Sequence, residues 1–366
     1  MKKFSLAFIL VLFIFMASAY GEEKNVAVEQ KLVTYDQPVI ENSKKDLLEK
    51  LDENIKTVNI MNDGISSILW GTPKNEKVDT FINYFKTKLR DRFAIWLSRS
   101  SRYLPVISKI FEEHGLANEL VFLPLIESGF SPYATSRAQA VGMWQFIKGT
   151  AIRYGLRVDN FIDERRDPEK SAVAAAKYLK DLYEMFGSWD LALAAYNAGE
   201  GKIMRIINAK GTNDFWEVIT HKKVKRETKE YVPRFVAATL IAKEPEEHGF
   251  DGIEYLPPLE YEEVLLPPKT TLASVAKIIN VDENTLREYN PAIKYGVLPP
   301  DTPYNVRIPK DKVSLLIENI DNLEQADFKT LKKIMSKKQK HKHFKKKTKK
   351  RVLKKVAHVK RISNPL

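Results

Sequence analysis

The sequence predicts a mainly α-helical protein, in which a helical domain is followed by a small α+β module and a basic, disordered tail. From residue 78 to about residue 242, apolar residues recur at spacings of three and four, as they do in helices with one buried face. No alternating strand pattern of any length appears in this stretch. A proline-rich segment, GIEYLPPLEYEEVLLPPK, then follows, and from Lys329 on the chain is low in complexity and strongly basic.

The N-terminus has the form of a secretory signal peptide. Lys2 and Lys3 precede an apolar run, and the small residues Ala17-Ser18-Ala19 suit a cleavage site. The alternative is an uncleaved N-terminal anchor. No later stretch reaches the roughly 18 apolar residues of a membrane span. We therefore expect a signal peptide at 1–19, a polar lead-in at 20–77, and an exported protein of the periplasm or cell envelope, either soluble or peripheral on the membrane.

Cysteine is absent, which excludes disulfides, cysteine metal sites and thiol catalysis, and we expect neither metal nor cofactor. The net charge of +13 belongs to the tail. From Lys329 to the end there are 17 lysines and arginines and no acidic residue. Without this tail and the two signal-peptide lysines, 41 basic residues remain against 47 acidic ones, so the body carries about −6. The basic composition is therefore no argument for nucleic-acid binding.

Several helices of the first domain can be located by residues that typically begin, end or line a helix. Asp167-Pro168-Glu169 has the pattern of an N-cap, a first-turn proline and a first-turn acid. Asp190 is the expected cap of the next helix, LALAAYNA, which a pair of glycines ends. Helical spacing in GMWQFIKGTAIRYGL predicts a buried stripe with Gln145 off it, made of Met143, Phe146, Ile147, Thr150, Ala151 and Tyr154.

Residues 262–310 predict a module with the order strand, helix, helix, strand. The segment TLASVAKIINVDENTLREYNPAI contains two short helices, the second beginning at Asp282 or Glu283. The segment PYNVRIP has the pattern of a closing strand. There is no second copy of this pattern, so we expect a single module.

Glu127 is the first candidate for chemistry, because it directly follows an apolar run in LPLIESGF. Charged residues rarely enter such a run without a partner. One interpretation is a helix-end carboxylate that turns to water. The other is a carboxylic acid kept protonated to serve as a proton donor. Apolar surroundings raise a carboxyl pKa, and Gly129, a plausible helix stop, would place Glu127 near a helix C-terminus, which acts in the same direction.

Four polar residues that follow Glu127 in the sequence could form a hydrogen-bonding cleft with its carboxyl group. Ser136 lies in the polar loop ATSRAQA, Gln145 follows Gly142, and Tyr196-Asn197 ends the alanine-rich helix. Each alone has an ordinary structural explanation as a turn, surface or packing residue. Other acids have better structural explanations: Asp163, Glu164 and Asp167 sit beside two arginines, which indicates capping and ion pairing. No second catalytic carboxylate is evident, although the fold could bring one in.

Taken together and in order, these motifs resemble the catalytic domain of the lytic transglycosylases. The resemblance rests on LPLIESGFSPYATSRAQAVGMWQF, DERRDPEKSAVAAAKYL, LALAAYNAGEGKI and ETKEYVPRFVAATLIAK, covers about residues 78–250, and is nearest to the membrane-bound lytic murein transglycosylase D group. It implies a lysozyme-like fold acting on peptidoglycan. It also implies that Glu127 is the single catalytic acid and that the substrate-binding residues are Ser136, Met143, Gln145, Tyr196, Asn197, Glu227 and Tyr231.

The implied reaction needs only one carboxyl group. Family members cleave the β-1,4 bond between N-acetylmuramic acid (MurNAc) and N-acetylglucosamine (GlcNAc) without water, because the muramyl 6-hydroxyl attacks its own anomeric carbon and leaves a 1,6-anhydro ring. Ordinary glycosidases need a second carboxylate as base or nucleophile, whereas here one group can act first as acid and then as base. Two alternatives stay open: a hydrolytic muramidase and a non-catalytic wall-binding scaffold.

One departure from the family pattern lies next to the cleft. Val224-Lys225 stand before Glu227 where the family has Leu-Pro, so a cleft-lining loop differs in shape, and the assignment of Glu227 is weaker than that of Glu127. The stretch THKKVKR makes this loop unusually basic. An anionic stem peptide is therefore a candidate contact.

The C-terminal regions suggest binding to the cell wall or an anionic surface. Residues 262–309 resemble a LysM-type module, although Lys269-Thr270 replace the usual Gly-Asp, and the module either binds GlcNAc chains or serves as a structural part of the catalytic domain. The tail, 329–366, is predicted to contact anionic membrane or wall polymer; the alternative is a solvated appendage. Nucleic acid is not an expected partner of an exported protein, and we expect a monomer. The apolar residues of the tail are Leu331, Ile334, Met335, Leu353, Val356 and Val359.

Overall fold

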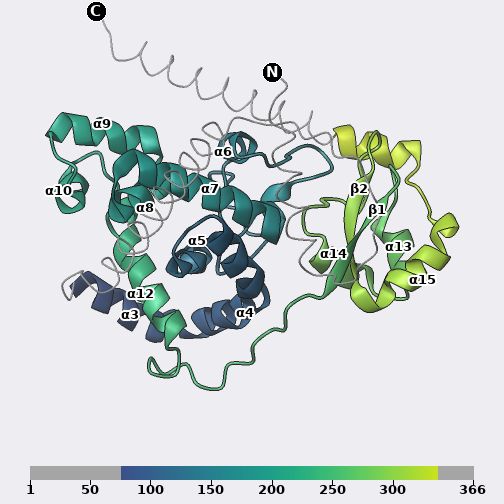
Figure 1. Cartoon of the computed structure of the whole chain (residues 1–366), viewed down its shortest axis with the longest axis horizontal. Coiled ribbons are helices and arrows are strands. Elements are labelled where there is room, and N and C mark those ends of the chain that lie inside the picture. Colours follow the sequence, from purple (N-terminus) through teal and green to yellow (C-terminus); the bar gives the residue numbers. More distant parts are fainter. Residues whose placement is uncertain (1–75, 337–366) are drawn as a thin grey trace, which may run out of the picture. The chain divides into compact units, whose positions relative to one another are not determined.

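The structure is a computed structural model, and it describes residues 76–336. The predicted signal peptide, the lead-in up to residue 75 and the tail from residue 337 on lie outside the described residues. Within residues 76–336 the chain is mainly helical, and the named strands form one two-stranded sheet (Figure 1). The mainly α prediction is therefore confirmed. No helix in these residues is long and apolar enough to cross a membrane.

The helical domain is a succession of helices that pack around one hydrophobic core. They are α3 (Glu76–Lys86), α4 (Arg90–Glu113), α5 (Leu123–Ser128), α6 (Lys148–Arg153), α7 (Pro168–Phe186), α8 (Trp189–Ala198), α9 (Glu200–Lys210), α10 (Phe215–Thr220), α11 (Arg226–Lys229) and α12 (Tyr231–Lys243), with 3-10 turns η1 (Asn118–Phe122) and η2 (Glu164–Arg166).

Helix α7 lies at the centre of this core, and α4 and α8 both pack on it. Its buried face is rich in alanine, with Ala172, Ala175 and Ala176 fully buried. Small side chains let neighbouring helices approach closely, and the space between them is filled by large side chains such as Trp144 and Trp189. Helix α12 runs against α3 and α5, which brings the end of the domain back to its beginning.

The start of α7 is as predicted. The Asp167 side chain accepts hydrogen bonds from the backbone N–H groups of Glu169 and Lys170, and Pro168 occupies the first turn. The start of α8 differs from the prediction, because the N-cap is Ser188 and Asp190 lies inside the first turn. The helix begins earlier because the buried Trp189 ring already belongs to it.

The predicted helical stripe from Met143 onward is wrong at its beginning. Residues 141–147 form a tight turn closed by bridges from Val141 to Thr135 and Phe146, and α6 covers only Lys148–Arg153. Gly142 adopts a φ of 86° there, and a Cβ on it would lie 1.7 Å from the backbone oxygen of Arg165. Helical spacing could not reveal that this backbone packs directly on another backbone. Ile147, expected in the stripe, is 56% exposed.

The small module has the predicted order of elements. Strands β1 (Tyr261–Leu266) and β2 (Tyr304–Pro309) pair antiparallel, with Val264 opposite Val306. Helices α13 (Leu272–Ile278) and α14 (Glu283–Tyr289) lie between the strands in sequence, and α15 (Val313–Glu318) follows them. Thr271 and Asp282 cap α13 and α14 through their side chains. The remaining short turns are η3 (Lys310–Lys312) and η4 (Ile320–Asn322).

The beginning of the predicted tail belongs to the module. Residues 328–336 are helical, and Leu331 and Ile334 are buried in the same hydrophobic cluster as the residues of β2 and α13. The prediction of disorder from Lys329 on is therefore wrong for residues 329–336. The many lysines of this segment suggested disorder. Its two apolar side chains at helical spacing are nevertheless enough to hold a short helix against the core of the module.

Candidate active site

Glu127 lies in the last turn of α5, after the buried residues Leu123, Pro124 and Leu125. Gly129 ends the helix in the left-handed conformation, with a φ of 60°, so the predicted helix stop is found. Helix α4 holds this turn from outside. Arg99 Nη1 donates to the Gly129 carbonyl at 2.6 Å, and the Trp96 ring is so close that a Cβ on Gly129 would lie 2.2 Å from it.

Glu127 faces an open cavity of about 460 Å³. This volume is in the range of small-molecule and sugar sites. Residues from α5, the 134–147 loop, α6, α7, α8, α9, α11 and α12 line it together. Among them are Glu127, Ser136, Gln145, Tyr178, Tyr196, Asn197, Glu200, Glu227, Tyr231 and Arg234.

Burial raises the pKa of Glu127 from 4.5 to about 7. The hydrogen bond from Tyr231 lowers it, the negative charge of Glu227 raises it, and the positive charge of Arg234 lowers it again. The loss of hydration is the largest of these effects, as the apolar residues before Glu127 predict. The carboxyl group is therefore about half protonated near neutral pH.

Two tyrosines surround the carboxyl group. Tyr231, the first residue of α12, donates its hydroxyl hydrogen to Glu127 Oε1. Tyr196 donates its hydroxyl to the Trp144 carbonyl at 2.8 Å, which fixes the ring at the cavity wall. Burial, followed by the Glu127 charge, raises the pKa of both phenols well above 10, so both stay neutral hydrogen-bond donors.

The predicted polar residues also line the cavity. Ser136 Oγ accepts from the Ala140 N–H at 3.1 Å, which closes the loop that carries it. Gln145 has a φ of 49°, and its Nε2 donates to the Gly142 carbonyl at 2.7 Å. Asn197 Oδ1 accepts from the Thr228 hydroxyl at 2.8 Å, so α11 orients the last turn of α8.

Met143 is a correction to the predicted substrate-binding set. Its side chain is fully buried in the core and does not line the cavity, so it cannot contact a bound sugar. Its backbone carbonyl instead accepts a hydrogen bond from Ser128 Oγ at 2.9 Å, which ties the turn after Glu127 to the opposite loop. Glu227 lies on α11 with an exposed side chain that lines the cavity.

The fold brings a further carboxylate, Glu200, into the cavity lining. Burial alone would raise its pKa, but hydrogen bonds from the backbone, Arg153 and Tyr178 lower it below the usual value. Arg153 Nη1 lies 2.9 Å from Glu200 Oε1, and the Tyr178 hydroxyl donates to Oε2 at 3.0 Å. Sequence reasoning missed Glu200 as a residue of the cavity. The signal that could have found it is its position between two glycines, directly after the helix that ends with Tyr196-Asn197.

The three acids interpreted as structural lie outside this cavity. Asp163 pairs with Arg165 at 2.8 Å, Glu164 with Lys170 at 2.7 Å, and Asp167 caps α7. Within residues 76–336, no group of three or more acidic or histidine side chains is placed to hold a metal ion.

Comparisons with known proteins match two regions of the chain. Residues 106–219 match the family model of the transglycosylase SLT domain. The chain therefore contains a transglycosylase SLT domain. Residues 260–325 match the LysM-like domain of lytic transglycosylase MltD, so a LysM-like domain follows the SLT domain. The resemblance to the lytic transglycosylases is confirmed. The first match includes Glu127, Ser136, Gln145, Tyr196 and Asn197, whereas Glu227, Tyr231 and Arg234 lie between the two matched regions.

Curated relatives are similar to part of the chain. The chain is 34% identical over 237 residues to membrane-bound lytic murein transglycosylase D of Escherichia coli strain K12, which covers 62% of this chain and 51% of the relative. It is 40% identical over 106 residues to the peptidoglycan transglycosylase gp16 of Escherichia phage T7, covering 28% of this chain and 8% of the relative. The chain thus spans about half the length of the E. coli relative.

Two solved structures match part of the chain. An inactive mutant of lytic transglycosylase Slt from Pseudomonas aeruginosa has a TM-score of 0.33 and 23% identity, over 42% of this chain and 25% of that one. The soluble lytic transglycosylase SLT70 from Escherichia coli has a TM-score of 0.34 and 21% identity, over 43% and 27%.

Proposed function

We propose that this protein is a peptidoglycan lytic transglycosylase, which cleaves the β-1,4 bond between MurNAc and GlcNAc and forms 1,6-anhydro-MurNAc. The observation that carries the proposal is Glu127 in the SLT domain, which lines the cavity with a pKa raised to about 7. A carboxyl group with this pKa is protonated in a large fraction of molecules at neutral pH and can act as a general acid.

In the first step, Glu127 gives its proton to the glycosidic oxygen while the bond from that oxygen to the muramyl anomeric carbon breaks. The Tyr231 hydroxyl donates to Glu127 Oε1 and stabilises the carboxylate that forms. Ser136, Gln145, Tyr196 and Asn197 bind the sugar rings on either side through hydroxyl, amide and ring contacts.

In the second step, the carboxylate of Glu127 removes the proton from the muramyl 6-hydroxyl. The oxygen attacks the anomeric carbon of the same sugar and closes the 1,6-anhydro ring. Because the nucleophile is already attached to the substrate, it needs no second carboxylate to activate it. Glu127 ends the cycle protonated again, and the net transfer of the proton is from the 6-hydroxyl to the leaving sugar.

A hydrolytic muramidase is the second candidate, and Glu200 is the observation that favours it. Its lowered pKa keeps it ionised while Glu127 is protonated, which is the division of roles used by two-carboxylate glycosidases. A third possibility, from a different class, is a non-catalytic wall-binding scaffold.

Mass spectrometry of digested sacculi distinguishes the three. We expect anhydro-ended muropeptides from the wild type and a loss of about 100-fold or more in their release by Glu127→Gln. Glu200→Gln should retain the product type. Reducing-ended products that disappear in Glu200→Gln would favour the muramidase, and no cleavage by the wild type would favour the scaffold. Full activity of Glu127→Gln would overturn the catalytic assignment.

We further propose that the protein is exported to the periplasm or cell envelope and works there as a monomer, with peptidoglycan glycan strands as its substrate. The LysM-like domain binds GlcNAc chains, and the basic tail contacts anionic membrane or wall polymer. The relatives named membrane-bound transglycosylases support an envelope location. Co-sedimentation with sacculi and with anionic vesicles measures the two contacts, and particle mass in solution tests the monomer.

A further inference from the structure

A cavity of about 290 Å³ lies where the SLT domain meets the LysM-like domain, and we call it the junction cavity. From the SLT domain it is lined by Tyr133, in the loop that also carries Ser136, and by Arg166, the last residue of η2. From the LysM-like domain it is lined by residues of α14 and the loop after it, among them Arg287 and Lys294. The Tyr133 hydroxyl donates to the Arg287 carbonyl at 2.9 Å, so the two domains touch at this cavity. A ligand bound in it would contact both domains.

Arg166 is the unusual residue of the junction cavity. Its Nε atom is buried and has no hydrogen-bond partner, and its side chain has no ion pair within residues 76–336. The preceding residue, Arg165, shows the contrast: its Nε and Nη2 each lie 2.8 Å from an oxygen of Asp163, and its Nη1 donates to the carbonyls of Gln139 and Phe146. Because buried donors are rarely left unpaired, the exception at Arg166 indicates an acceptor from outside the described chain.

Lys294 brings a second positive charge to the same cavity. Its Nζ donates to the Asp159 carbonyl at 3.0 Å, which is a neutral acceptor, and it has no ion pair among the described residues. Burial lowers the pKa of Lys294, the charge of Asp163 raises it, and the charge of Arg166 lowers it again. The two cations therefore repel each other across a small cavity, and an anion bound between them would relieve this repulsion.

The other charged groups in the described lining of the junction cavity already have partners. Arg287 Nε donates to Glu283 Oε1 at 2.8 Å. Glu288 pairs with Arg102 Nη1 at 3.3 Å. Neither of these pairs supplies an acceptor to Arg166.

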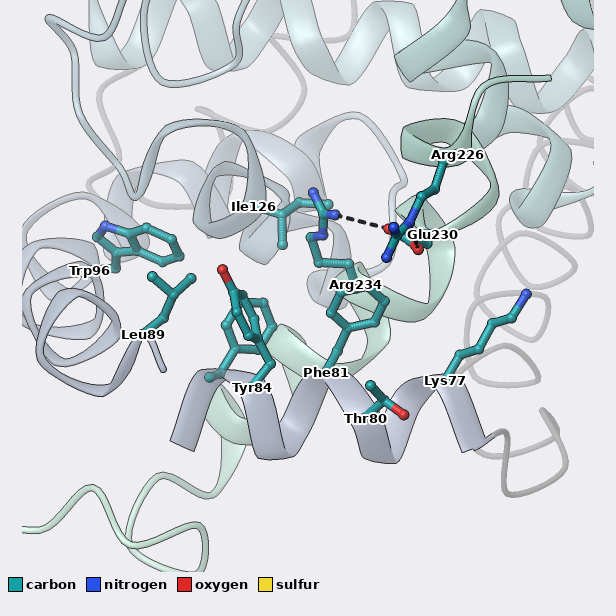
Figure 2. A pocket seen from close by; sticks show the side chains of 11 residues that line it. Lys77, Thr80, Phe81, Tyr84, Leu89, Trp96, Ile126, Arg226, Glu230 and Arg234 are labelled. Carbon is teal, nitrogen blue, oxygen red and sulfur yellow. Dashed lines mark hydrogen bonds and ion pairs between the residues drawn. The ribbon is translucent and has the colours of Figure 1, made fainter. Parts of the chain in front are cut away.

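A cavity of about 500 Å³ beside the candidate active site shows the more usual arrangement. Figure 2 shows Glu230 there between Arg226 and Arg234. Its Oε1 lies 2.6 Å from Arg226 Nε, and its Oε2 lies 3.6 Å from Arg234 Nη2. The fold thus supplies these two arginines with a carboxylate, whereas it brings Arg166 to a cavity without one.

We propose that the junction cavity binds a phosphate group, either inorganic phosphate or a phosphate monoester, with Arg166 and Lys294 as its cationic ligands. The planar guanidinium of Arg166 offers parallel N–H donors to two oxygens, and the ammonium group of Lys294 can reach a third. A phosphate monoester carries about −1.5 to −2 at neutral pH, which matches two cations, whereas a carboxylate carries a single charge. The small volume favours a compact group over a larger organic ligand. The inference does not depend on the proposed function.

Thermal unfolding of the full chain in potassium phosphate and in potassium chloride, at equal ionic strength and neutral pH, tests the site. We expect phosphate to raise the unfolding temperature of the wild type by about 2 °C. This shift should disappear in Arg166→Gln and in Lys294→Gln. Arg205→Gln is the matched control and should keep the shift, because Arg205 is exposed on α9 and lines none of the three cavities described above.

The same measurement in chloride distinguishes a ligand-binding role of Arg166 from a structural one. Arg166→Gln removes a repulsion and breaks no ion pair of the described residues, so it should unfold at the temperature of the wild type or higher. A lower unfolding temperature in chloride would show that Arg166 has a structural partner and would overturn the proposal.

Calorimetric titration of the full chain measures the affinity. We expect inorganic phosphate to bind about tenfold more weakly to Arg166→Gln than to the wild type, and acetate to bind the wild type about tenfold more weakly than phosphate does. All variants keep the basic tail, so differences between them report on the cavity. No phosphate binding by the wild type, equal binding by Arg166→Gln, or acetate binding as tight as that of phosphate would each contradict the assignment.

A short-chain phosphatidic acid, dihexanoyl phosphatidic acid kept below its micelle concentration, distinguishes the two sources of the phosphate group. If it competes with inorganic phosphate and binds more tightly, the site takes a lipid headgroup. If inorganic phosphate binds and the lipid does not, the site takes free phosphate. Both results support a phosphate site, provided that the binding depends on Arg166.

Discussion

At the scale of the residue, Glu127 occupies a position that lowers the stability of the fold when its carboxyl group is ionised. The apolar residues of α5 remove water from its carboxyl group, and the turn at Gly129 is held by Trp96 and Arg99, so the group cannot easily swing out to solvent. The same burial that makes a proton available at neutral pH opposes ionisation in the folded state.

We therefore expect Glu127→Gln to stabilise the folded protein at alkaline pH. The folded-state pKa of about 7 lies above the ordinary 4.5, so between these values the folded state holds a proton that the unfolded state has lost. By linkage, the free energy of unfolding of the wild type falls as the pH rises through this window, by at most about 3 kcal/mol. Glutamine does not titrate and avoids this loss.

Urea unfolding at pH 4.5 and pH 8.5 measures the effect. The two proteins should have similar stability at the lower pH, and the variant should be more stable at the higher pH. Glu184→Gln, at an exposed position of α7, is the matched control and should show no such difference. A wild type that matches Glu127→Gln at both pH values would show that Glu127 is not protonated in the folded state.

At the scale of the element, the turn at residues 141–147 positions Gln145 in the cavity. Gly142 makes two hydrogen bonds that hold this turn together. Its N–H donates to the Ala134 carbonyl at 3.0 Å, and its own carbonyl accepts from Gln145 Nε2. The backbone of Arg165 passes so close that no side chain fits between.

Gly142→Ala should therefore lower both stability and activity. The new Cβ would lie 1.7 Å from a backbone oxygen at a φ of 86°, so the turn must shift, at a cost of about 3 kcal/mol or more in unfolding free energy. Gly155→Ala is the control: its φ is 87°, but no atom lies within 4 Å of the added Cβ, so we expect about 1 kcal/mol. Thermal unfolding and release of muropeptides measure both, and equal losses for the two variants would contradict the packing argument.

The elements that the sequence predicted correctly depend on neighbours within one or two turns of the chain. The capping of α7 by Asp167, the helix stop at Gly129 and the order of strands and helices in the module are all of this kind. The turn at Gly142 was mistaken for a helix because its backbone conformation is imposed by Arg165, which is distant in sequence.

In the candidate site, too, residues within recognisable motifs were predicted, whereas residues brought together only by the fold were not. The order of motifs identified Glu127 and the polar residues that line its cavity, because each lies in a recognisable stretch. Tyr178, Glu200 and Arg234 come from α7, α9 and α12 and become neighbours only in the fold. Met143 was assigned with them from its motif, yet packing turned its side chain into the core.

At the scale of the whole molecule, the LysM-like domain is joined to the SLT domain through the start of α7. Arg307 of β2 is buried and lies 3.1 Å from Asp167, the residue that caps α7, and 3.4 Å from Glu169. Ile162 forms a bridge with Ile293 and contributes to the hydrophobic cluster of the module. A buried charge pair that loses one member is strongly destabilising, so these contacts favour a fixed junction.

The boundary between this module and the basic tail makes the role of the tail testable. Residues 337–366 contain 14 lysines and arginines and no acidic residue, whereas Leu331 and Ile334 belong to the module core. Removal of residues 337–366 should therefore keep the fold intact and remove most of the attraction to an anionic surface, to which each basic residue contributes about 1 kcal/mol near the membrane.

We expect the truncated chain to co-sediment less with anionic phospholipid vesicles at physiological salt, and to cleave solubilised glycan strands as fast as the full chain. Vesicles of zwitterionic lipid are the control, and neither chain should bind them strongly. Raising the salt concentration should weaken binding of the full chain, because screening shortens the reach of its charges. If truncation leaves binding to anionic vesicles unchanged, the tail is a solvated appendage, and membrane contact must come from the rest of the protein, whose net charge of about −3 (44 basic against 47 acidic residues, without Lys2, Lys3 and residues 337–366) would oppose it.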